Sequence, residues 1–258
     1  MNYGLYLSTS GVLTNMYRQD VFANNLANAD TAGFKPDFAD LMQRDAEAIE
    51  DQVGFDVSQD LLDRLGGGVL AAESQTSYKQ GALKQTGIKT DIGLMEPNQF
   101  LAVEDVVDGN AVVRLTRDGR ISMDAEGYLV LSSGKRLLDA KDQPIRIDRG
   151  REFQITQAGD VQQDEQVVAR LQVAQVADTN QLRKIGGGLF ELNNASARDI
   201  LEQVQLKPGH VESSAVDPIK TLMNLISATK AASGNARMIK YHDTFMDRAI
   251  NTLGRVTA

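Results

Sequence analysis

The sequence contains no cysteine and no tryptophan, and only two of its 258 residues are histidine. Without cysteine there are no disulfides, thiolate nucleophiles or cysteine-based metal sites. His210 and His242 do not form the i, i+4 pair that a helical zinc motif needs. We therefore expect no bound metal and no cofactor. Aromatic residues make up 5% of the chain, so platforms for stacking sugars are also scarce.

Long apolar runs are missing too. No segment approaches the roughly 18 consecutive apolar residues typical of a membrane-spanning helix, so we expect no membrane insertion. The residues after Met1 form neither a basic n-region nor an apolar h-region, and we expect no cleaved secretory signal. A net charge of −8 argues against general nucleic-acid binding.

Motifs of enzymes are likewise absent. There is no G-x-S-x-G elbow, and neither Gly66–Gly68 nor Gly186–Gly188 has the spacing of a phosphate-binding loop. Asp118 and Asp124 occur in turn-forming segments, where turn chemistry accounts for them. We therefore predict that the chain is not an enzyme. A carbohydrate-facing β module remains an alternative.

Four regions follow one another along the chain. Residues 2–29 have apolar positions at helical spacing, and Asp30-Thr31-Ala32-Gly33 breaks that pattern. An acidic connector follows over 37–72, in which Asp37 to Leu65 hold nine acidic and two basic residues. The connector has potential helical pieces at Phe38–Ile49 and Gln59–Leu65, and its three consecutive glycines indicate a hinge.

The third region, residues 73–213, is predicted to be β-rich. Turn sequences recur about every eight residues, as in a meander of short antiparallel strands. The Asp118-Gly119 pair predicts a hairpin between the strands on either side of it, and further turns are expected at Asp124–Gly127 and Ser132–Lys135.

The fourth region, about 216–256, is predicted to be a long helix. Asp217 is suited to cap it, Pro218 fits its first position, and Gly254 marks its end. Thr229, Ser233 and Asn235 interrupt its apolar stripe, which favours packing against several neighbours over a closed two-helix pair. The sequence thus predicts an α+β protein with helices at both ends and a central domain of short antiparallel strands.

One stretch carries a resemblance to a known family. The sequence Ala23-Asn24-Asn25-Leu26-Ala27-Asn28-Ala29-Asp30-Thr31-Ala32-Gly33-Phe34-Lys35 closely resembles the signature of the flagellar rod and hook proteins. Three further segments resemble motifs of the same family, in the same order: Gly81–Gly87, Leu115–Arg120 and Val211–Pro218. Ala215 departs from the usual asparagine, and Glu96–Phe100 departs from the usual glycine-rich element.

The resemblance implies a coiled coil of the N- and C-terminal helices, formed by residues 1–36 with 214–258. It implies a β-rich body over 73–213, joined by the connector at 37–72. It further implies a subunit of the flagellar basal-body rod in the periplasm-spanning shaft, exported through the flagellar type III machinery. Its implied partners are copies of itself and other rod and hook proteins.

Among members of the family, the chain length fits the rod proteins and is short for the hook protein, and the connector favours a proximal-rod-like member over the distal type. A hook or hook-associated protein of the same family is the alternative. From the stripes and the signature, the expected assembly interface comprises Leu5, Val12, Met16, Phe22, Asn24, Asn25, Leu26, Asn28, Gly33, Phe34, Leu222, Ile226, Ile239, Met246 and Leu253.

Overall fold

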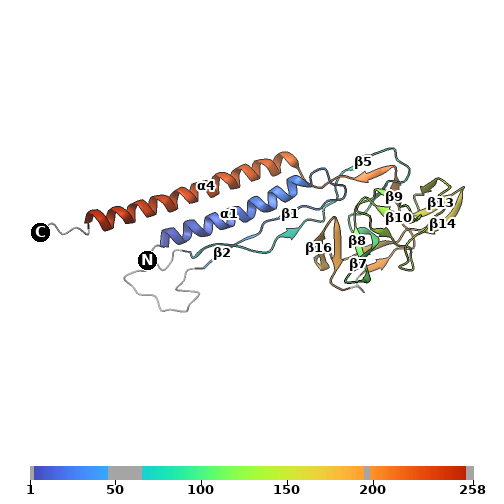
Figure 1. Cartoon of the computed structure of the whole chain (residues 1–258), viewed down its shortest axis with the longest axis horizontal. Coiled ribbons are helices and arrows are strands. Elements are labelled where there is room, and N and C mark those ends of the chain that lie inside the picture. Colours follow the sequence, from blue (N-terminus) through green and yellow to red (C-terminus); the bar gives the residue numbers. More distant parts are fainter. Residues whose placement is uncertain (1–2, 46–65, 195–197, 254–258) are drawn as a thin grey trace. The chain divides into compact units, whose positions relative to one another are not determined.

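The computed structural model describes residues 3–45, 66–194 and 198–253 (Figure 1). Its contacts divide the chain into two compact units. A helical unit contains Met1–Ala27, Asp37–Gln75 and Asp217–Ala258, and a body unit contains Asn28–Pro36 and Thr76–Val216. An N-terminal helix, a β-rich central region and a C-terminal helix follow in the predicted order. The predicted division at residues 36, 72 and 213 stays a prediction.

Two long helices dominate the helical unit. Helix α1 spans Tyr3–Ala27, and helix α4 spans Pro218–Arg248 and continues into a π-helical turn, η4 (Ala249–Leu253). Asp217 caps α4 as predicted, because its carboxylate accepts a 3.1 Å hydrogen bond from the backbone N–H of Lys220. The predicted end at Gly254 lies outside the described residues.

A two-stranded ribbon packs against α1. Strand β2 (Leu41–Arg44) pairs antiparallel with β3 (Gly68–Ala71), with Met42 opposite Leu70, and β1 (Asp37–Phe38) precedes them. The helix predicted at Phe38–Ile49 is therefore wrong over its described part, because cross-strand hydrogen bonding overrides a weak helix propensity. The piece predicted at Gln59–Leu65 lies outside the described residues. Gly68 belongs to β3, and the hinge stays a prediction.

The body unit is built from short strands. They are β5 (Leu83–Gln85), β6 (Ile92–Leu94), β7 (Gln99–Val107), β8 (Asn110–Thr116), β9 (Ile121–Met123), β10 (Leu129–Leu131), β11 (Arg136–Leu137), β12 (Phe153–Ile155), β13 (Asp160–Gln163), β14 (Gln166–Arg170), β15 (Val173–Val176), β16 (Leu182–Gly186), β17 (Leu189–Leu192), β18 (Arg198–Ile200), β19 (Leu206–Pro208) and β20 (His210–Glu212). A 3₁₀ turn, η2 (Thr179–Gln181), precedes β16, and β4 (Gln75–Thr76) lies where the two units meet in the sequence.

The main sheet of the body has nine strands in the order β16-β17-β8-β7-β11-β10-β9, with β15 bridging β7 and β18. All of its pairs are antiparallel, as predicted. Strand β7 is long enough to pair with β8 from Leu101 to Val107 and, on its other side, with β15 and β11 at successive positions. The body also contains a β12-β13-β14 sheet and the pairs β19-β6 and β20-β5.

The predicted meander is confirmed for two of its turns. The turn at Asp124–Gly127 joins the paired strands β9 and β10, and that at Ser132–Lys135 joins β10 and β11. The hairpin predicted at Asp118-Gly119 is wrong, because β8 pairs with β7 and β17 and not with β9. The Asp-Gly hairpin turn is instead Asp108-Gly109, where both residues have positive φ.

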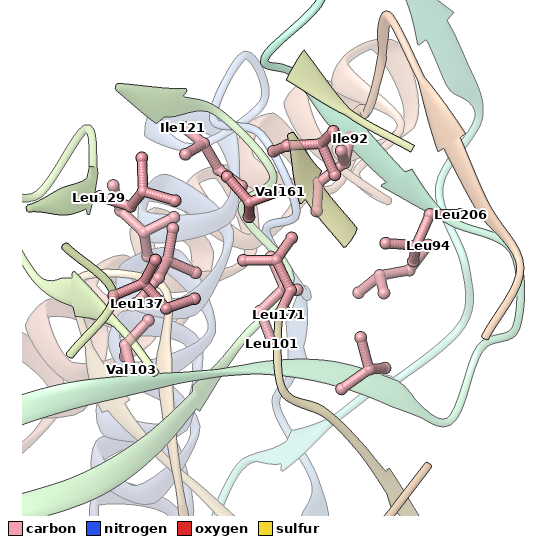
Figure 2. Close-up of a cluster of buried hydrophobic side chains, with 14 of the residues drawn as sticks. Ile92, Leu94, Leu101, Val103, Ile121, Leu129, Leu137, Val161, Leu171 and Leu206 are labelled. Carbon is pink, nitrogen blue, oxygen red and sulfur yellow. The ribbon is translucent and has the colours of Figure 1, made fainter. Parts of the chain in front are cut away.

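Two buried clusters stabilise the body. The larger one gathers aliphatic side chains such as Leu101, Leu129 and Val161 (Figure 2). The smaller one centres on Phe100 and Phe190, whose rings meet edge to face with centroids 5.6 Å apart. Tyr78 packs against both rings, and its hydroxyl donates to the carbonyl of Leu182. Arg117, a member of the charged cluster described below, directly follows β8, whose Leu115 belongs to the smaller buried cluster.

Candidate assembly surfaces and a buried charged cluster

Helices α1 and α4 lie side by side and run antiparallel (Figure 1). Gly4 faces His242, and Gly11 faces Asn235. The two glycines are one heptad apart on α1, and the two residues that face them are one heptad apart on α4. A Cβ at Gly4 would lie 2.6 Å from His242 Nε2, and one at Gly11 would likewise clash with Asn235. One heptad before Asn235, Ala228 is 1% exposed. The α4 face toward α1 thus carries small and polar side chains at its closest contacts.

Several large apolar side chains of α4 lie on another face. Positions 219, 223, 226, 230, 233, 237, 241 and 245 recur at intervals of three and four, so they share one side of the helix. We call this side the outward stripe: Ile219, Met223, Ile226, Lys230, Ser233, Arg237, Tyr241 and Phe245. Ile219 is 75% exposed and Phe245 67% exposed. At 100° per residue, this stripe points away from the side that holds Ala228, Asn235 and His242.

Helix α1 and the ribbon also expose apolar side chains. Tyr6, Leu13 and Met16 are exposed on α1, and Met42 and Leu70 are exposed opposite each other on the ribbon. A cavity of about 300 Å³ lies between them, lined by Tyr6, Leu13, Leu70 and their neighbours. We call this the α1–ribbon surface: Tyr6, Thr9, Leu13, Met16 and Asp20 of α1 with Met42 and Leu70 of the ribbon.

At the end of α1, the signature asparagine Asn25 is buried and 4% exposed. Its Nδ2 donates to the carbonyl of Asp37 at 2.6 Å, and its Oδ1 accepts from the N–H of Asp37 at 3.0 Å. The side chain therefore bonds to the backbone as a neighbouring strand would, and it fastens the start of β1 to α1. Sequence reasoning placed Asn25 at a helix end but did not anticipate this partner.

Residues 28–35 of the signature belong to the body unit. Gly33 has φ of 67°, and a Cβ there would lie 2.5 Å from the backbone carbonyl carbon of Arg117, so only glycine fits. Its N–H donates to the carbonyl of Glu212 at 2.8 Å, and the N–H of Ala215 donates to the carbonyl of Phe34 at 3.1 Å. The ring of Phe34 is buried beneath the ammonium of Lys184, 3.9 Å from the ring centroid. The segment thus lies beside the residues that lead to α4.

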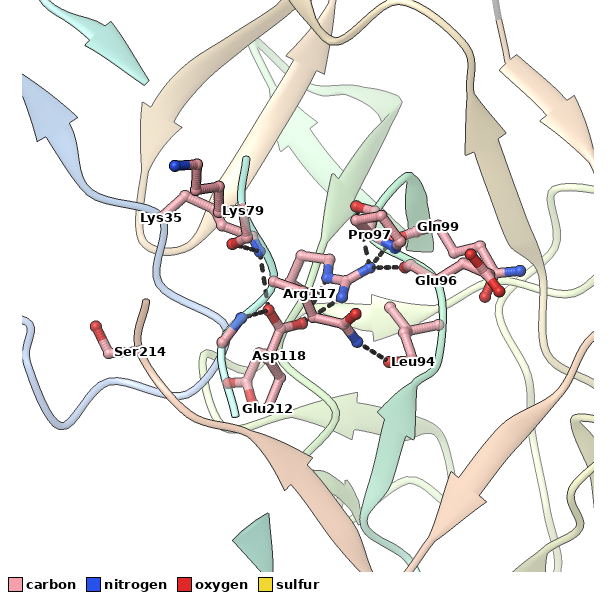
Figure 3. Close-up of polar contacts among 12 residues, drawn as sticks. Lys35, Lys79, Leu94, Glu96, Pro97, Gln99, Arg117, Asp118, Glu212 and Ser214 are labelled. Atoms are coloured by element: carbon pink, nitrogen blue, oxygen red, sulfur yellow. Dashed lines mark hydrogen bonds and ion pairs between the residues drawn. The ribbon is translucent and has the colours of Figure 1, made fainter. Parts of the chain in front are cut away.

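Lys35, Arg117 and Glu212 form a buried charged cluster (Figure 3). Glu212 Oε1 accepts from Lys35 Nζ at 2.8 Å and from the N–H of Gly81 at 2.8 Å, and Oε2 accepts from Arg117 Nε at 2.7 Å. Lys35 also donates to the carbonyl of Lys79, and Arg117 to the carbonyls of Glu96 and Gln99. These contacts join five separate segments of the chain.

Two cations and one carboxylate share this buried space. Burial lowers the pKa of Lys35 below its ordinary value, and the nearby Glu212 carboxylate opposes that shift. Burial also lowers the pKa of Arg117, again opposed by Glu212. Because each cation depends on the same carboxylate, removing Glu212 would leave both buried without a counter-charge.

The predicted interface residues differ in exposure. On α1, Leu5, Val12, Phe22 and Leu26 are half-buried, Met16 and Asn24 are exposed, and Asn25 is buried. On α4, Leu222, Ile226 and Met246 are exposed and Ile239 is half-buried, while the side chain of Leu253 lies outside the described residues. Asn28, Gly33 and Phe34 belong to the body unit. A role for each in assembly stays a prediction.

Sequence reasoning missed the charged cluster, although its members stand in three of the motifs noted above. Lys35 ends the signature, Arg117 belongs to Leu115–Arg120, and Glu212 belongs to Val211–Pro218. The signal that could have indicated this cluster is that each of the three motifs contains one of these charged residues. Within residues 3–45, 66–194 and 198–253, acidic and histidine side chains form no group that could hold a metal ion. In those same ranges no helix has the length and apolarity needed to cross a membrane.

Comparison with known families matches both ends of this architecture. Residues 5–35 match the family model described as Flagella basal body rod protein. Residues 207–252 match the model described as Flagellar basal body rod FlgEFG protein C-terminal. The first match ends on Lys35 and the second includes Glu212, so the buried ion pair joins the two matched segments.

Full-length relatives agree with these matches. The chain is 29% identical to the flagellar basal-body rod protein FlgF of Caulobacter vibrioides, over 99% of this chain and 100% of that protein. It is 27% identical to the rod protein FlgG of Buchnera aphidicola (95% and 97%), and 25% identical to the hook-basal body complex protein FlhO of Bacillus subtilis (98% and 99%). The signature at 23–35, the two matched segments and the end-to-end similarity thus make this chain similar to the flagellar basal-body rod proteins.

Proposed function

We propose that this chain is a structural subunit of the bacterial flagellar basal-body rod and that it works by polymerising through its terminal helices. One observation carries the proposal. The outward stripe of α4 exposes its large apolar side chains, whereas the face toward α1 is small and polar at its closest contacts. A helix pair that functioned alone would bury its large apolar side chains between the helices.

The heptad spacing of Gly4 and Gly11 opposite His242 and Asn235 supports a coiled coil of α1 and α4. In this proposal, α1 and α4 of each subunit form the inner layer of the assembly. Small side chains let the two helices approach closely, which leaves their outer faces to meet neighbouring subunits.

The proposed subunit acts mechanically and not as a catalyst. Its partners are copies of itself and other rod and hook proteins, and its location is the basal body of the flagellum. The family resemblance also supports export through the flagellar type III machinery. We favour a proximal-rod-like position. A hook or hook-associated subunit is the second candidate, and the similarity to FlhO, a hook-basal body complex protein, favours keeping it.

The test is incorporation into basal bodies. A tagged copy is expressed in cells of the source bacterium that lack their own gene, and basal bodies are purified and assayed for the tag. We expect the unmodified chain in the rod and no incorporation of Ile226→Lys, which places a charge on the outward stripe. Asp243→Lys, an exposed change off the stripe on the same helix, serves as the matched control and should incorporate.

Leu26→Asp should also prevent incorporation while leaving the body folded. Phe34 is unsuitable for this purpose because it is buried in the body unit, so Phe34→Asp would disturb the body itself. Absence of the unmodified chain from basal bodies, or normal flagella in cells without the gene, would refute the proposed function.

A further inference from the structure

We propose that the outward stripe of α4 docks onto the α1–ribbon surface of a second copy of this chain, in a head-to-tail contact. This inference rests on the proposed function and specifies which two surfaces meet. It follows from three properties of the helical unit: two separate apolar surfaces, opposite charges on them, and their position on one chain.

The apolar parts complement one another in form. The outward stripe projects two apolar groups, Ile219, Met223 and Ile226 at its start and Tyr241 and Phe245 near its end. The α1–ribbon surface contains a cavity between Tyr6 and Leu13 on one side and Leu70 on the other. A projecting ring such as that of Tyr241 or Phe245 can enter this cavity and remove both surfaces from water.

The charges are also complementary. Between its two apolar groups the outward stripe carries Lys230 and Arg237, both exposed. Among the described residues of α1 and the ribbon segments, the exposed charged side chains are Asp20, Asp40, Asp45 and Glu73, which are all acidic. The basic residues there are half-buried: the Arg18 guanidinium lies over the ring of Phe22, and that of Arg44 lies over the ring of Tyr6.

These charges favour a contact between unlike surfaces. Two outward stripes facing each other would bring Lys230 and Arg237 against their own copies, and two α1–ribbon surfaces would bring together carboxylates. A basic apolar helix face also suits an anionic membrane, but here the chain itself supplies the matching acidic surface. Because both surfaces occur on one chain, a pair joined in this way still offers one free surface of each kind. Such a contact extends into a ring or an open helical filament.

Because the chain contains no cysteine, single cysteines can test the contact in the full-length protein. Leu13→Cys marks the α1–ribbon surface, and Tyr241→Cys marks the outward stripe. We expect a mixture of the two variants to form a disulfide-linked heterodimer under mild oxidation, while each alone stays largely monomeric. The chain that carries both changes should give a ladder of linked oligomers. Asp243→Cys, exposed on α4 away from the stripe, replaces Tyr241→Cys in the control mixture and should give only background.

Charge reversal provides the second arm. Arg237→Glu, added to the Tyr241→Cys chain, should reduce the heterodimer yield severalfold, and Asp20→Lys in the Leu13→Cys partner should restore it. Disulfide-linked homodimers of Tyr241→Cys alone would overturn the head-to-tail proposal and indicate a contact between two α4 helices instead. A mixture that gives no more product than the control overturns the proposal, and so does binding to anionic vesicles in place of cross-linking. If cross-linking fails while the unmodified chain enters basal bodies, the rod function stands and the neighbour is a different rod protein.

Discussion

The side-chain amide of Asn25 and the backbone of Asp37 exchange two hydrogen bonds, which tie the last turn of α1 to the strand that follows it. Asn25→Ala leaves both backbone groups of Asp37 without these partners, and we expect a loss of about 1–3 kcal/mol within the helical unit. Hydrogen exchange at Asp37 and Phe38 should become faster. Asn24→Ala, at the exposed neighbouring position, is the control, and equal exchange in both variants would contradict the assignment.

The buried cluster predicts a large difference between two glutamate variants. Glu212→Gln removes the only carboxylate shared by Lys35 and Arg117, and breaking a buried pair of this kind costs about 3–5 kcal/mol. Glu126→Gln removes the partner of Arg136 at an exposed site, where the loss should stay below about 1 kcal/mol. Urea unfolding of the body, followed by tyrosine fluorescence, measures both. A loss for Glu212→Gln no larger than for Glu126→Gln would show that the cluster does not stabilise the body.

Gly33 and Gly209 form a matched pair. Their φ angles are 67° and 69°, so alanine at either position costs about 1 kcal/mol or more through backbone strain. Only at Gly33 would the new Cβ also meet the backbone of Arg117, since no atom lies within 4 Å of the corresponding position at Gly209. We expect Gly33→Ala to lower the thermal midpoint of the body well beyond Gly209→Ala. Similar midpoints would mean that the 28–36 segment can move away from Arg117 at little cost.

Acid should weaken the sheet at Glu191. Hydrogen bonds from Arg183 and then from Arg114 lower the pKa of this carboxyl below its ordinary value of 4.5. Because the folded-state pKa is the lower one, the stabilisation is present above about pH 4.5 and is lost as the pH falls through the folded value. Glu191→Gln should reduce stability at neutral pH and flatten its decline in acid. Unfolding midpoints measured across this range test the point, and an unchanged acid slope would contradict it.

Local patterns in the sequence predicted much of the architecture. The cap of α4 depends on adjacent residues, Asp217 and Pro218, so it is visible in the sequence. The turns at Asp124–Gly127 and Ser132–Lys135 are local for the same reason. Strand β2 was mistaken for helix because its pairing with Gly68–Ala71 decides its conformation, and this pairing is not local.

Other features depend on contacts between distant residues. Lys35 and Glu212 are 177 positions apart, and Arg117 and Glu212 are 95 apart. A charged residue in a sequence normally indicates an exposed side chain, so burial of all three could not be anticipated from composition or period. In α4, the apolar positions were predicted as one stripe. The structure shows that α1 covers the side of α4 that holds Ala228 and Asn235 and leaves the outward stripe exposed, and the sequence alone does not distinguish these two sides.

The bonds between Gly33 and Glu212 and between Phe34 and Ala215 have a mechanical consequence. Helix α1 leads into residues 28–36 of the body, and residues 213–216 lead from the body to α4. The bonds hold these two segments together. A pull on both helices would therefore load these bonds and the Lys35–Glu212 pair first. The interior of the nine-stranded sheet would carry little of that tension. The body can therefore keep its fold while the shaft to which it is attached turns under torque.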